Sequence, residues 1–226
     1  MNKNWPYKIK AVIFDNDGTL MDTEWAHTWV VEEISGQKMT WELKSQLMGK
    51  NAMESSTIIC DHFSLNETPK EFCDRRTQLL EKCWENVELL PGAESIICSF
   101  FKAGIRMAIA TCSRRMVFNQ KIRNFSSLMS MIDHSVCGDD VLKGKPCPDI
   151  FLVAQSKWKN ILPQETLVFE DSPLGIKAAN LAGMASVYIP DAKIDPIKSV
   201  ENENACPQYT LKSLLEFDMN MFDWGV

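Results

Sequence analysis

The stretch AVIFDNDGT, residues 11–19, decides the fold, because it joins an apolar run to a turn that carries two carboxylates, Asp15 and Asp17. Four consecutive apolar residues, Ala11–Phe14, are typical of a strand buried on both faces, as in a parallel sheet. Asp-Gly after a strand is also a strong hairpin signal, but a hairpin needs a second strand, and a helical pattern follows here. Two carboxylates two residues apart can instead serve as nucleophile and proton-transfer partner on one reacting group.

Similar apolar runs recur along the chain and alternate with helical patterns. We expect strands at Ala11–Phe14, Arg106–Ala110, Ser135–Cys137, Leu167–Phe169 and Ser186–Ile189, with helices at Ala93–Lys102, Arg114–Arg123, Asp149–Lys157 and Leu174–Leu181. This alternation predicts an α/β fold with a Rossmann-like, doubly wound parallel sheet. Such a sheet binds its ligand at the carboxyl ends of the strands, so the residues that follow each strand are candidate site residues.

One long segment interrupts the alternation. Residues 23–88 show only amphipathic helical patterns, with Thr68 as a cap and Pro69 at the first helical position of the last one. We therefore predict a helical cap domain at 23–88, inserted into a core formed by 1–22 and 89–226. Beyond Asp191 we expect only a short strand near Gln208 and a closing helix at Leu211–Phe217.

The second strand end carries Thr111, Cys112 and Ser113. A simple structural interpretation is that Ser113 caps the helix that begins near Arg114. The same geometry offers backbone amides and a hydroxyl to a phosphate oxygen. The two interpretations are compatible, and this segment alone does not decide between them.

Two further strand ends supply a cation and two acids. Lys145 lies between a strand and a helix in a loop stiffened by Pro146 and Pro148. Glu170 and Asp171 follow another apolar strand, where Ser172 and Pro173 also mark a helix start. Carboxylates gathered at one sheet edge either take up protons or bind a cation, and hard oxygen ligands favour Mg²⁺.

At these residues the sequence resembles the haloacid dehalogenase superfamily. Phe14–Thr19 is similar to its nucleophile loop, Thr111 to its phosphate-binding threonine, Lys145 to its lysine, Glu170-Asp171 to its acidic metal motif, and the helical insertion to its small cap. Leu47–Ala52, Leu90–Glu94, Ala110–Arg114, Gly138–Asp140 and Gly144–Phe151 are similar to pseudouridine-5′-phosphatases. Cys112, Cys147 and Asn16 depart from the usual pattern, which leaves fine substrate preference open.

The resemblance implies a Mg²⁺-dependent phosphatase that acts on small phosphorylated metabolites through an aspartyl-phosphate. Asp15 is then the nucleophile and Asp17 the acid and base. Thr111, Cys112, Ser113 and Lys145 bind phosphate. Asp15, Asp171, Glu170 and the backbone carbonyl of Asp17 hold the metal. In the cap, Glu24, His27, Gly49 and Lys50 are candidates for substrate contact.

Three alternatives stay open. A sugar phosphomutase would use the same Asp15 chemistry. It remains an alternative because His27 lies on the first predicted cap helix, near where related sugar phosphomutases place a histidine. A dehalogenase needs neither a leaving-group acid nor a metal, so Asp17, Glu170 and Asp171 disfavour it. A non-enzymatic phosphate-binding relative would be expected to lack at least one of Asp15, Asp17, Lys145 or Asp171, and all four are present.

Composition excludes several other classes. The net charge of −6, from 30 acidic and 24 basic residues, argues against a nucleic-acid polymer as partner. No apolar run has the length of a membrane span or a signal peptide, so we expect a cytoplasmic protein, and nothing in the sequence demands more than a monomer. The eight cysteines show no C-x-x-C pattern, which predicts reduced, mostly buried thiols rather than disulfides or a zinc site.

Overall fold

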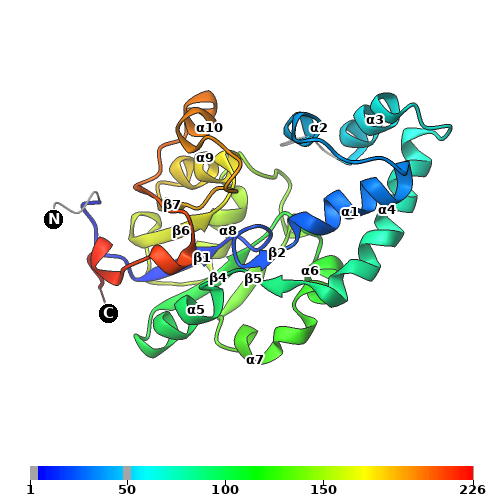
Figure 1. The fold of residues 1–226 in the computed structure, drawn as a ribbon. Coiled ribbons are helices and arrows are strands. Elements are labelled where there is room, and N and C mark those ends of the chain that lie inside the picture. The colour runs from blue at the N-terminus through cyan, green and yellow to red at the C-terminus, as the bar shows by residue number, and fades with distance from the viewer. Residues whose placement is uncertain (1–4, 48–51, 226) are drawn as a thin grey trace. The chain divides into compact units, whose positions relative to one another are not determined.

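The computed structural model describes residues 5–47 and 52–225. The chain divides into two compact units, a core unit of Met1–Asp22 with Glu88–Val226 and a helical unit of Thr23–Val87 (Figure 1). Within the described residues, no helix is both long and apolar enough to cross a membrane.

The core unit is built on a six-stranded sheet in the order β5-β4-β1-β6-β7-β8, with every neighbouring pair parallel. Its strands are β1 (Ala11–Phe14), β4 (Arg106–Ala110), β5 (His134–Val136), β6 (Thr166–Glu170), β7 (Ala185–Tyr188) and β8 (Tyr209–Thr210). The predicted doubly wound parallel sheet is therefore confirmed. The predicted bounds of β1 and β4 match those observed.

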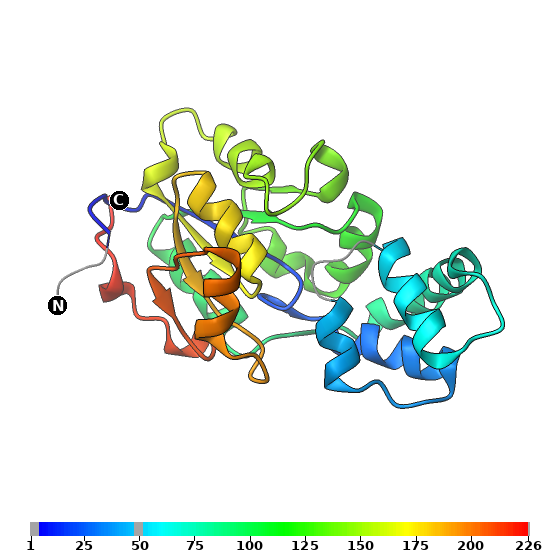
Figure 2. The same cartoon turned by 90° about the horizontal axis from the view of Figure 1, so that it is seen from above.

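Helices cover both faces of this sheet (Figure 1). They are α5 (Ala93–Lys102), α6 (Arg115–Lys121), α7 (Ser126–Met129), α8 (Asp149–Ser156), α9 (Pro173–Leu181) and α10 (Pro196–Glu203). Helix α5 lies on one face, while α9 and α10 lie side by side on the other (Figures 1 and 2). Phe14 packs between Phe100 of α5 and Phe169 of β6, with ring centroids 6.1 and 5.0 Å away.

A short ribbon closes the turn after β1. Strand β2 (Met21–Asp22) pairs antiparallel with β3 (Glu88–Leu89) at the two points where the chain leaves and re-enters the core unit. Two residues are too few to show an alternating pattern, so this ribbon was not predicted.

The C-terminal segment differs from the prediction. The expected helix at Leu211–Phe217 is only a single 3₁₀ turn, Leu214–Glu216, and Phe217 instead packs its ring against Phe169, 5.0 Å away. Helix α10 was not predicted, although Asp195 caps it and Pro196 occupies its first position.

The helical unit contains α1 (Glu24–Ser35), α2 (Trp41–Leu47), α3 (Ala52–Phe63) and α4 (Pro69–Cys83), followed by a 3₁₀ turn at Trp84–Asn86. Its small core gathers Val31, Leu43, Ile59, Phe63 and Phe72. The predicted cap of α4 is present: Glu71 donates its backbone N–H to Thr68, and Thr68 donates its own to the Glu71 carboxylate.

All eight cysteines are free. The expectation that most are buried is wrong, because only Cys60, Cys83 and Cys137 are buried. Cys112 and Cys206 are exposed.

Candidate active site

The register of the sheet brings the predicted strand ends together. Phe14 pairs with Ile109 of β4 and with Phe169 of β6. The residues that follow these three, Asp15, Ala110 and Glu170, therefore lie level at the carboxyl edge of the sheet. The Asp15 backbone N–H donates to the Phe169 carbonyl at 2.9 Å, which fixes the start of the turn.

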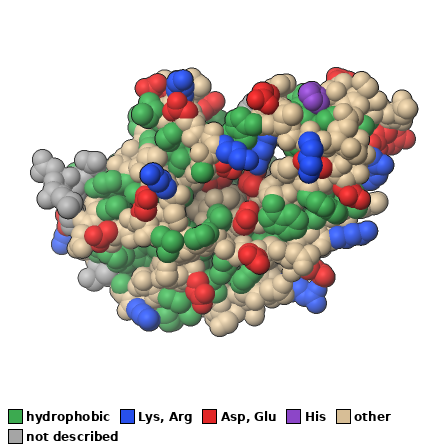
Figure 3. All heavy atoms as spheres, viewed as in Figure 1, with side chains coloured by type: hydrophobic (Ala, Val, Ile, Leu, Met, Phe, Trp, Pro, Cys, Tyr) green, Lys and Arg blue, Asp and Glu red, His purple; other side chains and the backbone are tan. Residues whose placement is uncertain are grey.

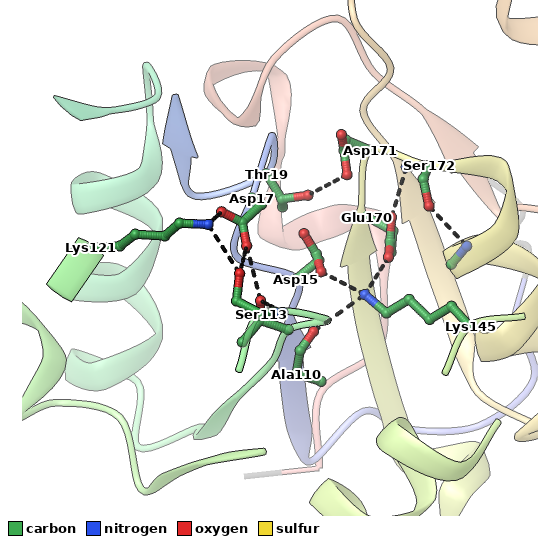
Figure 4. A network of polar contacts seen from close by, with 12 residues as sticks. Asp15, Asp17, Thr19, Ala110, Ser113, Lys121, Lys145, Glu170, Asp171 and Ser172 are labelled. Atoms are coloured by element: carbon green, nitrogen blue, oxygen red, sulfur yellow. Dashed lines mark hydrogen bonds and ion pairs between the residues drawn. The ribbon is translucent and has the colours of Figure 1, made fainter. Parts of the chain in front are cut away.

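Three carboxylates meet at this edge. Asp15, Glu170 and Asp171 each offer an oxygen within 4.8 Å of the others. Asp15 is 5% exposed and Glu170 only 1%. The Lys145 ammonium lies between two of them, 2.5 Å from Asp15 Oδ1 and 2.6 Å from Glu170 Oε1 (Figure 4). We call these four residues the acidic cluster.

The acidic cluster carries more negative than positive charge. Burial raises the pKa of Asp15 to about 8, and repulsion from Glu170 and Asp17 adds to this, although Lys145 opposes it. Burial alone would lower the pKa of Lys145, but its attraction to Asp15 and Glu170 raises that pKa well above its usual value. Three acids facing one ammonium leave a deficit of positive charge, and a divalent cation bound by carboxylate oxygens would remove it.

Two glycines leave room for the acids. Gly18 has a φ of +83°, and a Cβ there would collide with the Asp171 carboxylate. A Cβ at Gly175, in the first turn of α9, would collide with the Glu170 carboxylate. The Ser172 backbone N–H donates to Glu170 Oε2 at 2.7 Å, and the Ser172 hydroxyl caps α9 as the sequence indicates.

Asp17 has different surroundings. Its Oδ2 accepts from the Thr111 hydroxyl at 3.0 Å and from the Ser113 hydroxyl at 2.9 Å, the latter seen in Figure 4. Its Oδ1 lies 2.5 Å from the ammonium of Lys121, a side chain that is only 3% exposed. Burial would raise the pKa of Asp17, but the attraction to Lys121 and these hydrogen bonds together lower it to about 2. We call these four residues the Asp17 pocket.

The predicted phosphate-binding segment is thus engaged with Asp17 in this structure. The Thr111 hydroxyl also accepts the Ser113 backbone N–H at 3.0 Å. Ser113 does not cap the following helix as expected: α6 begins at Arg115, whose backbone N–H donates to the Asp139 carboxylate at 2.9 Å. Cys112 lies between Thr111 and Ser113 and is exposed.

Lys121 was not predicted as a site residue. Its signal is its spacing, because Lys121 follows the buried Phe118 by three residues and so lies on the same helix face. A lysine at a core-facing helix position needs a partner, and here the partner is Asp17.

The residues predicted for the cap fall in the helical unit. Glu24 and His27 both lie on α1 and line one pocket with Lys44 and Arg76, two residues that the sequence analysis did not select. Gly49 and Lys50 lie outside the described residues.

The surface seen in Figure 3 carries lysine and arginine side chains interspersed with aspartate and glutamate. Among the described residues on this face, lysine and arginine side chains form no continuous basic area of the kind that binds a polyanion.

Comparison with known families matches residues 12–189 to the haloacid dehalogenase-like hydrolase family. The matched range includes the whole acidic cluster and the Asp17 pocket.

Several relatives align over nearly the full chain. The chain is 35% identical to (DL)-glycerol-3-phosphatase 1, mitochondrial, of Arabidopsis thaliana, over 96% of this chain and 74% of that protein. It is 34% identical to a probable pseudouridine-5′-phosphatase of Drosophila melanogaster, over 95% of this chain and 94% of that protein.

Solved structures share the fold. CbbY from Rhodobacter sphaeroides in complex with phosphate superposes with a TM-score of 0.77 at 24% identity, covering 95% of this chain and 99% of that one. A putative beta-phosphoglucomutase from Thermotoga maritima gives a TM-score of 0.72 at 28% identity, with 90% and 94% covered.

Proposed function

Because the chain belongs to the haloacid dehalogenase-like hydrolase family, we propose that it is a Mg²⁺-dependent phosphatase of small phosphorylated metabolites, with Asp15 as covalent nucleophile. The observation that carries this proposal is the acidic cluster, in which Asp15, Glu170 and Asp171 bring carboxylate oxygens within 4.8 Å of one another beside Lys145. A nucleophile, a cation and a metal-ligand set are the groups that phosphoryl transfer to a carboxylate needs.

The residues of the acidic cluster suit Mg²⁺. Asp15 and Asp171 would hold the ion with the backbone carbonyl of Asp17, and Glu170 would help directly or through water. When bound, the ion offsets the repulsion between the Asp15 carboxylate and the phosphoryl oxygens.

The reaction then has two steps, in which Asp15 and Asp17 take different roles. In the first, an Asp15 oxygen forms a bond to phosphorus while the bond to the leaving oxygen breaks, and Asp17 gives that oxygen a proton. In the second, Asp17 takes a proton from water, the water oxygen bonds to phosphorus, and the bond to Asp15 breaks to release phosphate. Lys145 stays fixed between Asp15 and Glu170 and contributes positive charge beside the reacting group.

Asp17 cannot give a proton from the position seen here, where Lys121 keeps it ionised. The proposal therefore requires the Asp17 carboxylate to leave the Lys121 ammonium and take up a proton before it acts as an acid. Thr111 and Ser113 would at the same time become available to phosphate oxygens, the role predicted from the sequence.

The relatives named above suggest phosphate monoesters of small alcohols and nucleosides as substrates. We propose glycerol phosphates and pseudouridine 5′-phosphate as the first compounds to compare. The helical unit would act as a cap that excludes water during the first step.

Phosphate release from an aryl phosphate, with and without chelator, tests the proposal. We expect release that chelation abolishes and Mg²⁺ restores, and a panel of glycerol, nucleoside and hexose phosphates then ranks substrates. Release that persists in chelator would contradict the metal's role. Isomerisation of hexose phosphates without net release would favour the phosphomutase, and the absence of any turnover would favour a binding protein.

A further inference from the structure

The helical unit contains a pocket of its own, with a volume of about 350 Å³, and all of its described lining residues belong to this unit. The polar part of the lining includes Glu24, His27, Lys44 and Arg76. The apolar part includes Val31 and Ile59, two members of the unit's small core. A concave site with an apolar wall and a few convergent polar groups is typical of small-molecule binding.

The charges of the described lining residues do not balance. Lys44 and Glu24 form an ion pair at 3.0 Å, with side chains 22% and 44% exposed, so these two charges offset each other. Arg76 then leaves the lining with one more positive than negative charge.

Arg76 makes an unusual contact for a guanidinium. Its Nη2 lies 3.2 Å from His27 Nδ1, and its Nε is buried without a hydrogen-bond partner among the described residues. Burial lowers the pKa of Arg76, although the charge of Glu24 opposes this. Since a guanidinium only donates, His27 Nδ1 accepts, and the imidazole carries its proton on Nε2.

Partly burying a guanidinium with an unpaired N–H donor costs free energy unless an acceptor, such as an anion, pairs with that donor. A carboxylate or phosphate oxygen matches this need, because guanidinium N–H groups pair with such oxygens in a fixed geometry. The neighbouring Thr28 and Ser55, which also line the pocket, add hydroxyls for the uncharged part of a polar ligand.

We infer that this pocket binds a small organic anion, either a carboxylate or a second phosphate group, on Arg76 with His27 beside it. The anion has two possible sources. It is a second charged group of the phosphatase substrate, in which case the inference rests on the proposed function, or it is a separate effector molecule.

Two substrates that differ in one anionic group test the first source. Glycerol 3-phosphate and 3-phosphoglycerate are matched in size, and only the second carries a carboxylate. We expect Arg76→Met to reduce the kcat/KM ratio of 3-phosphoglycerate to glycerol 3-phosphate about tenfold relative to the unaltered protein. Arg75→Met is the matched control, because Arg75 is exposed and pairs with Glu67 at 2.8 Å, and it should leave the ratio unchanged.

Calorimetry with free glycerate tests the second source and does not depend on turnover. Glycerate binding that is lost in Arg76→Met but kept in Arg75→Met supports an anion site even if no phosphatase activity is found. If Arg76→Met and Arg75→Met agree in both the substrate ratio and glycerate binding, the inference is overturned. In that case, normal hydrolysis of an aryl phosphate would still support the proposed function.

Discussion

Asp15 and Asp17 belong to one turn and are separated by a single residue, yet their carboxylates have opposite electrostatic surroundings. Asp15 shares the acidic cluster with two other carboxylates and one ammonium, and its pKa is raised to about 8. Asp17 accepts from one ammonium and two hydroxyls, and its pKa is lowered to about 2. When the surroundings of two identical side chains push their pKa values apart, the chain has assigned them different tasks. The turn therefore separates a carboxylate that shares the Lys145 ammonium with Glu170 from a carboxylate that is ion-paired with Lys121.

The substitution Asp15→Asn tests the role of Asp15 in the acidic cluster. We expect turnover of an aryl phosphate to fall by at least about a thousandfold, because an amide cannot serve as the nucleophile. The variant should fold and should be at least as stable as the unaltered protein, since the uncharged amide avoids the cost of ionising a carboxyl beside Glu170 and Asp171. Undiminished turnover in a folded Asp15→Asn protein would remove the covalent mechanism.

The opposite pKa shifts also predict how stability depends on pH. Because folding raises the pKa of Asp15 from 3.8 to about 8, the folded state keeps a proton that the unfolded state has lost. The free energy of unfolding of metal-free protein should therefore fall, by several kcal/mol, as the pH rises from about 4 to about 8. The low pKa of Asp17 acts only below about pH 4, where its stabilisation is lost as the pH falls.

Urea unfolding in chelator at about pH 5 and about pH 8 measures this slope. Excess Mg²⁺ should restore the stability at the higher pH. Asp15→Asn is the control and should remove most of the slope. A metal-free protein that is more stable at pH 8 than at pH 5 would contradict the account of the acidic cluster.

The substitution Lys121→Met tests the ion pair in the Asp17 pocket. Removing the ammonium leaves the Asp17 carboxylate with hydroxyl partners only, and we expect a loss of about 1–3 kcal/mol in the free energy of unfolding at neutral pH. Lys177→Met is the matched control, because Lys177 meets Glu203 at 3.6 Å on the surface, and it should cost less than about 1 kcal/mol. Equal losses in the two variants would show that Asp17 does not depend on Lys121.

The residue between the two aspartates gives the smallest predicted effect. Asn16 is fully buried, and neither polar atom of its amide has a hydrogen-bond partner among the described residues. Asn16→Leu should therefore raise the free energy of unfolding by about 1 kcal/mol. Asn16→Ala, which removes the same polar atoms but leaves a cavity, should gain less. A loss of stability in Asn16→Leu would show that the amide is satisfied in solution.

The acidic cluster could be predicted from the sequence because the sheet register determines where its residues lie. Buried strands such as Ala11–Phe14 are evident as apolar runs, and parallel pairing then brings Asp15 and Glu170 to the same edge. No comparable rule places a side chain such as Asp17, whose direction depends on the rotamer that Lys121, Thr111 and Ser113 stabilise.

Dependence on tertiary contacts also explains the other differences between the predictions and the structure. Lys121 comes from a helix of seven residues, too short to show its buried face clearly. At the C-terminus, the ring of Phe217 packs on Phe169, and this tertiary contact outweighs the helical pattern of Leu211–Phe217. The pairing of Arg76 with His27 joins residues 49 positions apart, which no local pattern reveals.

Trapping the phosphorylated protein tests directly whether Asp15 is the covalent nucleophile. An aryl phosphate is mixed with the protein and Mg²⁺, the reaction is quenched in acid, and borohydride reduction marks any acyl phosphate for peptide mass spectrometry. We expect a single mark at Asp15, absent when Mg²⁺ is withheld and absent in Asp15→Asn. A mark on another residue, or continued turnover with no mark at Asp15 under any quench time, would contradict this role of Asp15.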